Sequence, residues 1–215
     1  MSIRALYSLL LALAVPAAAH AQAVSDSGTF VVRRGKDTVA TEQFVRTATR
    51  LEGTLALRNA KRTSERWTAV IAPDATLPLI EVTVQEGSAT SGAKARITQR
   101  ARVIFKEDSA AVDDLGGGGL QTRLFGTQIG AVPYLNLSFA LLEQAVRRAR
   151  ATDDPSQVPL FNLGGGQTAL AKLSRTKSDS VQLEIGDVRY DIRVDATGRL
   201  LGARILSQGV VVERR

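Results

Sequence analysis

Most of this chain alternates apolar and polar residues with a period of two, which is the pattern of β-strands that bury one face. The alternation is clearest in residues 79–86. It continues in residues 96–106, where Val103 and Phe105 lie on one face and arginine, threonine and lysine residues on the other. The apolar positions of the first segment are Ile80, Val82 and Val84. This pattern predicts a long antiparallel meander with one apolar and one cationic face.

Turn signals divide the remaining strands into hairpins. The glycine turn at 35–37 separates two β-branched runs, and a second pair is expected from 51–59 and 64–73, in which Trp67 anchors the core or its rim. Short alternating strands follow from residue 168 to the C-terminus. Among them, Asp195 starts a turn that Gly198 permits, because glycine tolerates a positive φ.

Residues 132–151 form the only long segment with helical spacing. Pro133 suits a first helical turn, where its missing N–H would have no partner. The main apolar stripe is Leu135, Phe139, Leu142, Val146 and Ala149, widened by Tyr134, Leu137, Leu141 and Ala145. The polar strip is narrow: Asn136, Glu143, Arg147 and Arg150, with Glu143 and Arg147 spaced for an i,i+4 ion pair. An arc this wide predicts a helix that either fills a curved sheet or lines an apolar cavity.

Two glycine runs, at 116–119 and 164–166, interrupt the strand pattern. No Gly-Lys-Ser/Thr follows the first run and no helix begins directly after it, so a nucleotide-binding loop is not indicated. We expect the first run to be a flexible joint or a strand interruption.

The N-terminus has the features of a secretory signal peptide: Arg4, a short apolar core, and a small-x-small site that predicts cleavage between Ala21 and Gln22. The apolar run is shorter than the roughly 20 residues that span a bilayer, and no later segment is longer, so no membrane span is expected. The predicted organisation is a signal peptide at 1–21 and a single domain at 22–215, exported to the periplasm or secreted.

Cleavage would also remove His20, the only histidine, and the chain has no cysteine. Disulfides, transition-metal sites built on imidazole or thiolate, and Ser-His-Asp or Cys-His catalysis are therefore excluded from the mature chain. No cofactor and no metal are expected. Loss of Arg4 lowers the formal net charge from +7 to +6. This charge favours contact with an anionic envelope surface, or is simply a solvated basic face, and no basic run interleaved with aromatics suggests nucleic acid.

Several short motifs resemble catalytic arrangements, but each lacks its context. Ser174 and Lys177 match Ser-x-x-Lys without the accompanying motifs of acyl-enzymes. Asp26-Ser27-Gly28 lacks the apolar strand that precedes an aspartic-protease triplet, and the pairs at 113–114 and 153–154 are adjacent carboxylates of the kind that usually point apart. We therefore expect no enzymatic activity.

The order of many strands, one helix and many strands predicts a mostly β (α+β) fold, a strongly curved antiparallel sheet or half-barrel around one central helix. The hairpins at 29–47 and 190–205 resemble the first and last hairpins of exported half-β-barrel proteins, which include uncharacterised periplasmic β-barrel-like domains and the LolA-like lipoprotein carriers. The resemblance implies a sheet wrapped around a helix and, as in several members, acyl chains held in the concavity.

The expected function is non-enzymatic binding of a lipid or other amphipathic ligand in this concavity. The residues expected to contact it are Tyr134, Leu135, Phe139, Leu142, Val146, Trp67 and Phe105. The alternative is a structural or protein-interaction module of the cell envelope with a filled core. An outer-membrane barrel fits poorly with the charged end at 213–215 and the few aromatics, and a hydrolase would depend on Ser174 or on an aspartate.

Overall fold

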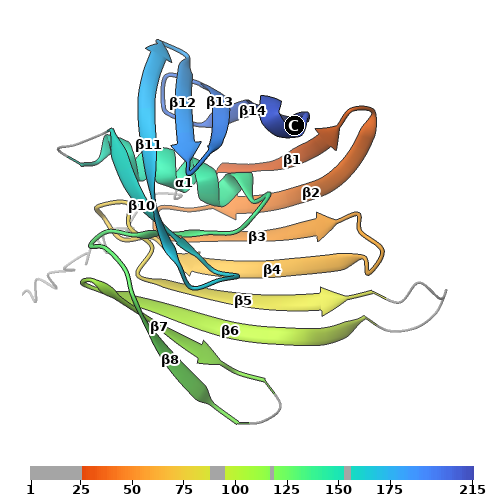
Figure 1. Cartoon of the computed structure of the whole chain (residues 1–215), viewed down its shortest axis with the longest axis vertical. Helices are drawn as coiled ribbons and strands as arrows, with labels where there is room; N and C mark the ends of the chain where they lie inside the picture. The colour runs from red at the N-terminus through yellow and green to blue at the C-terminus, as the bar shows by residue number, and fades with distance from the viewer. Residues whose placement is uncertain (1–25, 88–94, 117–118, 153–155) are drawn as a thin grey trace, which may run out of the picture.

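The computed structural model describes residues 26–87, 95–116, 119–152 and 156–215 (Figure 1). The predicted signal peptide, the acidic pair at 153–154, the centre of the first glycine run and most of the 87–92 turn lie outside these residues. The expectations for those segments therefore stay predictions.

The described residues form one 15-stranded sheet, one α-helix and a short 3-10 turn at Leu206–Gln208. The first eight strands are β1 (Asp26–Arg34), β2 (Asp37–Arg46), β3 (Arg50–Leu57), β4 (Thr63–Val70), β5 (Leu79–Glu86), β6 (Arg96–Lys106), β7 (Ser109–Asp114) and β8 (Gln121–Gly126). After them come β9 (Val132–Tyr134), helix α1 (Phe139–Arg150), β10 (Gln157–Asn162), β11 (Thr168–Lys177), β12 (Ser180–Ile185), β13 (Val188–Val194), β14 (Leu200–Ile205) and β15 (Val210–Arg214).

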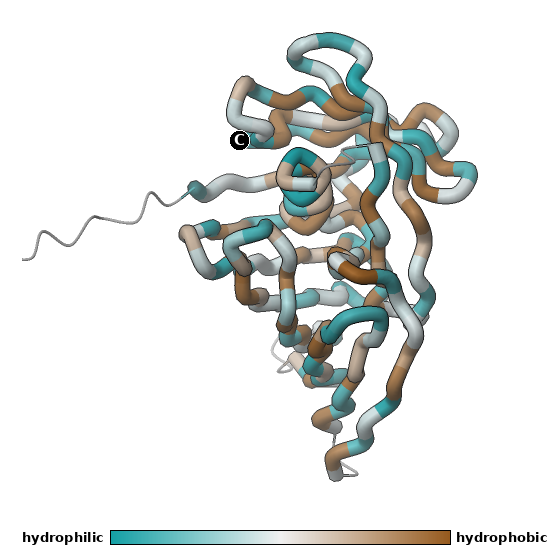
Figure 2. Tube along the Cα trace, turned by 90° about the vertical axis from the view of Figure 1, so that its left-hand side faces the viewer, coloured by the Kyte–Doolittle hydropathy of each residue, from teal (hydrophilic) through white to brown (hydrophobic). Residues whose placement is uncertain are grey.

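The two ends of the chain meet in the middle of the sheet. Strands β1 to β8 run outward on one side in chain order, while β15 pairs with β1 and the strands from β15 back to β9 run outward on the other. Phe30 of β1 lies opposite Arg214 of β15. Among the described strands, every pairing is antiparallel except that of β9 with β10. The sheet is open and curved, and α1 packs against its concave side (Figures 1 and 2), which confirms the predicted mostly β class with one helix.

The predicted turn chemistry is confirmed at both marked positions. Gly35 has a φ of 60° between β1 and β2, and Gly198 has a φ of 84° between β13 and β14. In the second turn the Asp195 carboxylate accepts hydrogen bonds from the N–H groups of Thr197 and Arg199, at 2.9 and 3.0 Å. The short polar side chain thus satisfies backbone donors that the turn leaves without strand partners.

The helix begins later than predicted. Pro133 is not in its first turn but in β9, where it pairs with Phe161 of β10. The chain then turns at Leu137, which has a φ of 65°, and Ser138 caps the helix by accepting from the N–H of Leu141. The helical spacing of 132–138 was misleading because a strand on the edge of the sheet, with its own backbone partners, accommodates the proline equally well.

The core lies between α1 and the concave side of the sheet. The helix packs mainly against β2, β9, β10 and β14. Every helical residue from Phe139 to Val146 is buried, the polar ones included. In contrast, β5 to β8 lie away from the helix, on the part of the sheet at the bottom of Figure 1.

Trp67 shows how closely the sheet packs next to the helix. Its ring is buried against Gly53, the residue directly opposite on β3. A Cβ atom at position 53 would lie 2.5 Å from the nearest ring carbon. Glycine at this position lets the indole lie flat on the neighbouring strand.

In the part of the chain that the structure describes, no helix has the length and apolar character needed to cross a membrane.

Candidate functional site

Four of the seven predicted ligand contacts lie in the core. Phe139, Leu142 and Val146 of α1 and Trp67 of β4 are each at most 2% exposed. The ring centres of Phe139 and Phe30 lie 6.1 Å apart, and the Phe30 ring stacks on the Phe44 ring with their centres 5.3 Å apart. Protein side chains therefore occupy the space that faces this part of the helix.

The remaining three predicted residues lie on or near β9 and β6. Tyr134 shares a 3.1 Å hydrogen bond with the hydroxyl of Tyr190. Phe105 meets the ring of Phe161 edge-on at 5.4 Å, and Leu135 lines a cavity that Phe161 also lines. Of the seven predicted residues, only Leu135 lines this cavity, and Tyr134 and Phe105 are partly buried against the core.

That cavity lies on the concave face of the sheet half that α1 does not cover. It has a volume of about 210 Å³ and is bounded by strands β4 to β8 and by the segment from β10 to Gly166. Its apolar lining consists of Val82, Val84, Ala101, Val103, Val112, Phe125, Leu135, Phe161 and Leu163. The second glycine run, at 164–166, forms part of the wall, and Gly166 has a φ of 72°.

Phe161 links this cavity to the rest of the core. Its ring is edge-on to Phe105 and lies 6.0 Å from Phe125, also in an edge contact. A Cβ atom on Gly166 would lie 2.4 Å from the Phe125 ring, so the absence of a side chain there gives the ring its place. Aromatic side chains and glycines together form one wall.

Two charged side chains interrupt the apolar lining. Glu65 of β4 lines the cavity and makes no hydrogen bond or ion pair with any described residue, and burial raises the pKa of its carboxyl. Arg123 of β8 lies over the ring of Phe125, 5.6 Å from its centre. An apolar wall with one carboxyl and one guanidinium suits an amphipathic molecule.

In the half of the molecule that contains α1, polar side chains lie at the start of the helix. Glu42 of β2 is fully buried and accepts hydrogen bonds from the Ser138 hydroxyl and from the N–H groups of Phe139 and Ala140, the latter two at 2.7 and 2.9 Å. The first N–H groups of a helix have no partner within it, so this carboxyl supplies one from the sheet. Burial raises the pKa of Glu42 to about 7, although the three hydrogen bonds act in the opposite direction.

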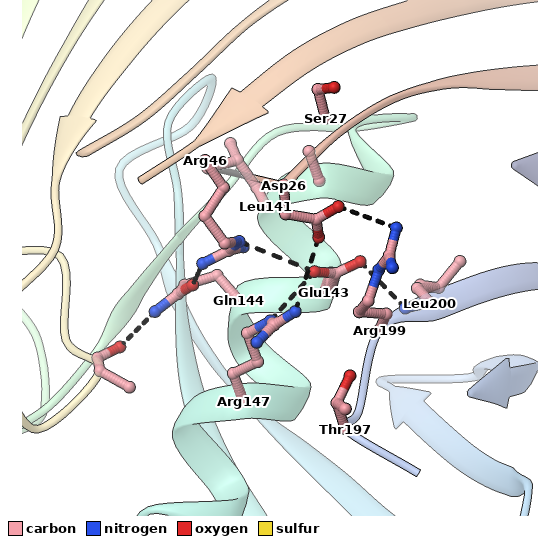
Figure 3. A network of polar contacts seen from close by, with 12 residues as sticks. Asp26, Ser27, Arg46, Leu141, Glu143, Gln144, Arg147, Thr197, Arg199 and Leu200 are labelled. Carbon is pink, nitrogen blue, oxygen red and sulfur yellow. Dashed lines mark hydrogen bonds and ion pairs between the residues drawn. The ribbon is translucent and has the colours of Figure 1, made fainter. Parts of the chain in front are cut away.

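Further along the helix, Glu143 is the centre of a buried ionic network (Figure 3). Its carboxylate accepts from the guanidinium groups of Arg147 and Arg214 and from the N–H of Leu200, at 3.0, 3.0 and 2.9 Å. Arg214 also donates to Asp26 at 2.6 Å and lies over the ring of Phe44. The predicted i,i+4 pair is therefore confirmed, and arginines from the sheet also pair with Glu143.

The short catalytic-looking motifs have structural roles or no shared site. Asp113 faces Arg102 and Thr122, each at 2.7 Å, and its neighbour Asp114 lies on the opposite face of β7. Asp26 belongs to the ionic network. Among the described residues, no group of three or more acidic or other ligating side chains is placed to hold a metal ion.

Sequence reasoning missed the inward-facing charged residues of β2 and β15, although a signal for them exists. In β2, Glu42 and Arg46 occupy the same alternation phase as Ala40 and Phe44, which are buried. In β15, Arg214 follows the buried Val210 and Val212 in the same way. A charged residue at a strand position where the alternation calls for an apolar one therefore indicates a charge that faces inward.

No protein-family model matches this sequence, and no curated protein matches it significantly. A solved structure does share the fold. The crystal structure of a DUF1089 family protein from Pseudomonas aeruginosa aligns with a TM-score of 0.54, over 80% of this chain and 91% of that one, at 11% sequence identity. At this identity the likeness concerns the mostly β fold alone, and the expected relationship to LolA-like carriers stays a prediction.

Proposed function

We propose that this protein is an exported, non-enzymatic carrier that binds an apolar or amphipathic molecule, a lipid, in the concavity of a half-barrel. The observation that carries the proposal is the cavity of about 210 Å³ on the helix-free half of the sheet. Its apolar walls would hold a hydrocarbon segment, and Arg123 would meet an anionic head.

The composition of the cavity favours a ligand bound there over a ligand bound along the apolar face of α1. Leu135 and Phe161 connect the cavity with the core, and Phe125 is only partly buried. Drug-sized ligands occupy pockets of roughly 300–1,000 Å³, so a cavity of this size accommodates part of an acyl chain. The rest of the ligand would extend toward solvent along β8.

Native mass spectrometry of the purified protein tests whether a lipid is bound after isolation. Titration with a fluorescent polyene fatty acid then measures affinity. Ala101 lines the cavity, and Ala101→Phe would fill it. We expect this variant to bind the fatty acid at least about tenfold more weakly, a loss of about 1.4 kcal/mol.

The matched control is Ala111→Phe. Ala111 lies on β7 opposite Ile104, and both residues belong to the outer face of the sheet. This change adds the same ring without entering the cavity, and its affinity should equal that of the unaltered protein. Equal weakening in both variants, or no binding by the unaltered protein, would contradict the proposal.

A second candidate is a structural or protein-interaction module of the cell envelope. The observation that favours it is the burial of the apolar helix residues, because the sheet and its side chains cover Phe139 and Leu142. It predicts a protein that isolates without lipid and gives no fatty-acid signal. Cross-linking in intact cells, with a partner recovered equally by the Ala101→Phe variant, would support it.

Export and contact with an anionic envelope surface belong to the same proposal. Both rest on the signal-peptide pattern and on the net positive charge of the sequence. Fractionation of cells that express the full chain, followed by N-terminal sequencing, tests for export and for a mature chain that begins at Gln22.

A further inference from the structure

A second, polar cleft lies on the other side of the molecule, beside the ionic network. It has a volume of about 860 Å³ and is bounded by the first residues of β1, the end of β2, the β4–β5 connection, α1 and the β13–β14 turn. None of its lining residues lines the apolar cavity. The arginines that line it are Arg46, Arg147 and Arg199 (Figure 3).

These arginines have more hydrogen-bond donors than the protein satisfies. The Arg46 side chain is 9% exposed and donates to Gln144, but its Nε and Nη2 atoms are buried without a hydrogen-bond partner. The Nε atom of Arg199 is likewise buried and unpartnered. Buried donors without partners are rare in folded proteins because each costs about 1–3 kcal/mol.

The acidic groups nearby already have arginine or backbone partners, except that one oxygen of Asp26 is buried without a hydrogen-bond partner. Glu143 accepts from Arg214 and Arg147 and lies 3.7 Å from Arg46. One Asp26 oxygen is shared by Arg214 and Arg199, and its other oxygen is 3.8 Å from Arg147. Asp195 accepts from the backbone and hydroxyl groups of its own turn.

Four arginines therefore face three carboxylates, which leaves one positive charge beside the cleft. Burial lowers the pKa of Arg46 to about 10, so its guanidinium still carries that charge at neutral pH. Arg147 and Arg199 are 26% and 42% exposed, which puts two guanidinium groups within reach of solvent. Their positions are fixed by ion pairs to Glu143 and Asp26.

We propose that this cleft binds a phosphate group, carried by a small soluble molecule or by a lipid headgroup. Guanidinium groups present paired N–H donors that match the oxygens of phosphate. Arg147 and Arg199 contact the oxygens from the open side, and Arg46, which also lines the cleft, adds charge and its unpartnered donors. The site is independent of the apolar cavity and of the function proposed for it.

Calorimetric titration of the purified protein with inorganic pyrophosphate at low ionic strength tests the soluble source. Flotation with vesicles of phosphatidylglycerol, compared with phosphatidylcholine, tests the headgroup. Arg199→Gln should weaken pyrophosphate binding by about tenfold, because a charge-assisted hydrogen bond is lost. Arg46→Lys keeps the positive charge but removes the paired N–H donors of the guanidinium, and should also weaken pyrophosphate binding.

The matched control is Arg189→Gln, which removes a more exposed charge, 59% against 42% for Arg199, that pairs with Asp191 of the same strand, β13. It should leave pyrophosphate binding unchanged, as should the cavity-filling Ala101→Phe. Thermal unfolding without ligand establishes that each variant is folded. Binding of pyrophosphate alone identifies a soluble ligand, and capture by phosphatidylglycerol vesicles that also depends on Arg199 identifies a headgroup. No binding in either arm, or equal losses in Arg199→Gln and Arg189→Gln, would overturn the proposal.

Discussion

The two halves of the concave face use the same alternation of apolar residues but bury them differently. Next to β2, β9, β10 and β14 the helix forms a second layer, and the fully buried charges Glu42 of β2 and Glu143 of α1 lie in this half. Over β5 to β8 that layer is missing, and only the segment that leads from β10 to Gly166 covers the cavity. The half of the sheet that the helix covers is called the filled half below, and the half that it leaves uncovered is called the hollow half.

The comparison shows that burial of charge depends on the partners available. In the filled half every buried carboxylate has several donors, because backbone N–H groups and arginines converge on it. In the hollow half, Glu65 makes no hydrogen bond or ion pair with any residue that the structure describes. The fully buried carboxylates of the filled half, Glu42 and Glu143, are therefore partnered, whereas the hollow half retains a carboxyl without such partners.

The largest effect is expected from Glu143→Gln, which removes the negative charge at the centre of the filled half. Arg214 and Arg46 would then be buried without that counter-charge. Loss of one partner of a buried ion pair destabilises proteins by about 3–5 kcal/mol. Urea unfolding of the variant should show a decrease of that size in the free energy of unfolding.

The control for this change is Glu52→Gln. Glu52 pairs with Arg50 on the protein surface, where both side chains are at least 40% exposed. Exposed ion pairs contribute about 0–1 kcal/mol. If Glu143→Gln were no more damaging than Glu52→Gln, the network would not stabilise the filled half.

The second prediction concerns the pH dependence of stability at the helix start. The pKa of Glu42 is about 7 in the folded protein and near its ordinary value of 4.5 when unfolded. Because the folded state holds this proton more tightly, the contribution of Glu42 is greatest below pH 4.5 and declines as pH rises to 7. The slope approaches 1.4 kcal/mol per pH unit, so the total loss is about 3 kcal/mol.

Chemical unfolding of the wild type and of Glu42→Gln between pH 4.5 and 8 measures this contribution. The glutamine variant keeps an acceptor for the helix N–H groups but does not titrate. The stability difference between the two proteins should therefore shift in favour of Glu42→Gln up to pH 7 and then become constant. A difference that does not change with pH would show that Glu42 stays ionised throughout.

The third prediction tests packing near the boundary between the halves. Gly53→Ala would place a Cβ atom within 2.5 Å of Trp67, and the ring must then move. Overpacking of this kind costs about 1–3 kcal/mol. Thermal unfolding should show a lower midpoint for Gly53→Ala, whereas Gly126→Ala, where a Cβ atom meets nothing within 4 Å, should stay close to the wild type.

Much of the fold was predictable because strand alternation and turn chemistry are local. The first hairpin, the Trp67 strand and the Asp195 turn all follow from residues adjacent in sequence. The start of the helix was not predictable in this way. Pro133 is compatible with a helix start and with an edge strand, and its pairing with Phe161 depends on a distant segment.

The candidate sites were less predictable than the fold, for a related reason. The apolar spacing of α1 correctly indicates a broad buried surface, but it cannot show whether a ligand or the protein itself covers that surface. Here Phe30 and the sheet cover Phe139. The cavity and the cleft both combine side chains from strands far apart in sequence, so their composition becomes visible only when the sheet is assembled.

The smallest effect on stability is expected from a substitution of Glu65, and it tests the difference between the two halves most directly. Glu65→Leu replaces a partly buried carboxyl that has no described partner with an apolar side chain of similar size. Burial of an uncompensated carboxylate is unfavourable, so the variant should be about 1 kcal/mol more stable at pH 7 in urea unfolding. The same substitution should tighten binding of the fluorescent fatty acid, because it removes a negative charge beside the proposed ligand. Loss of stability would mean that Glu65 has a compensating partner, and the hollow half would then follow the same rule as the filled one.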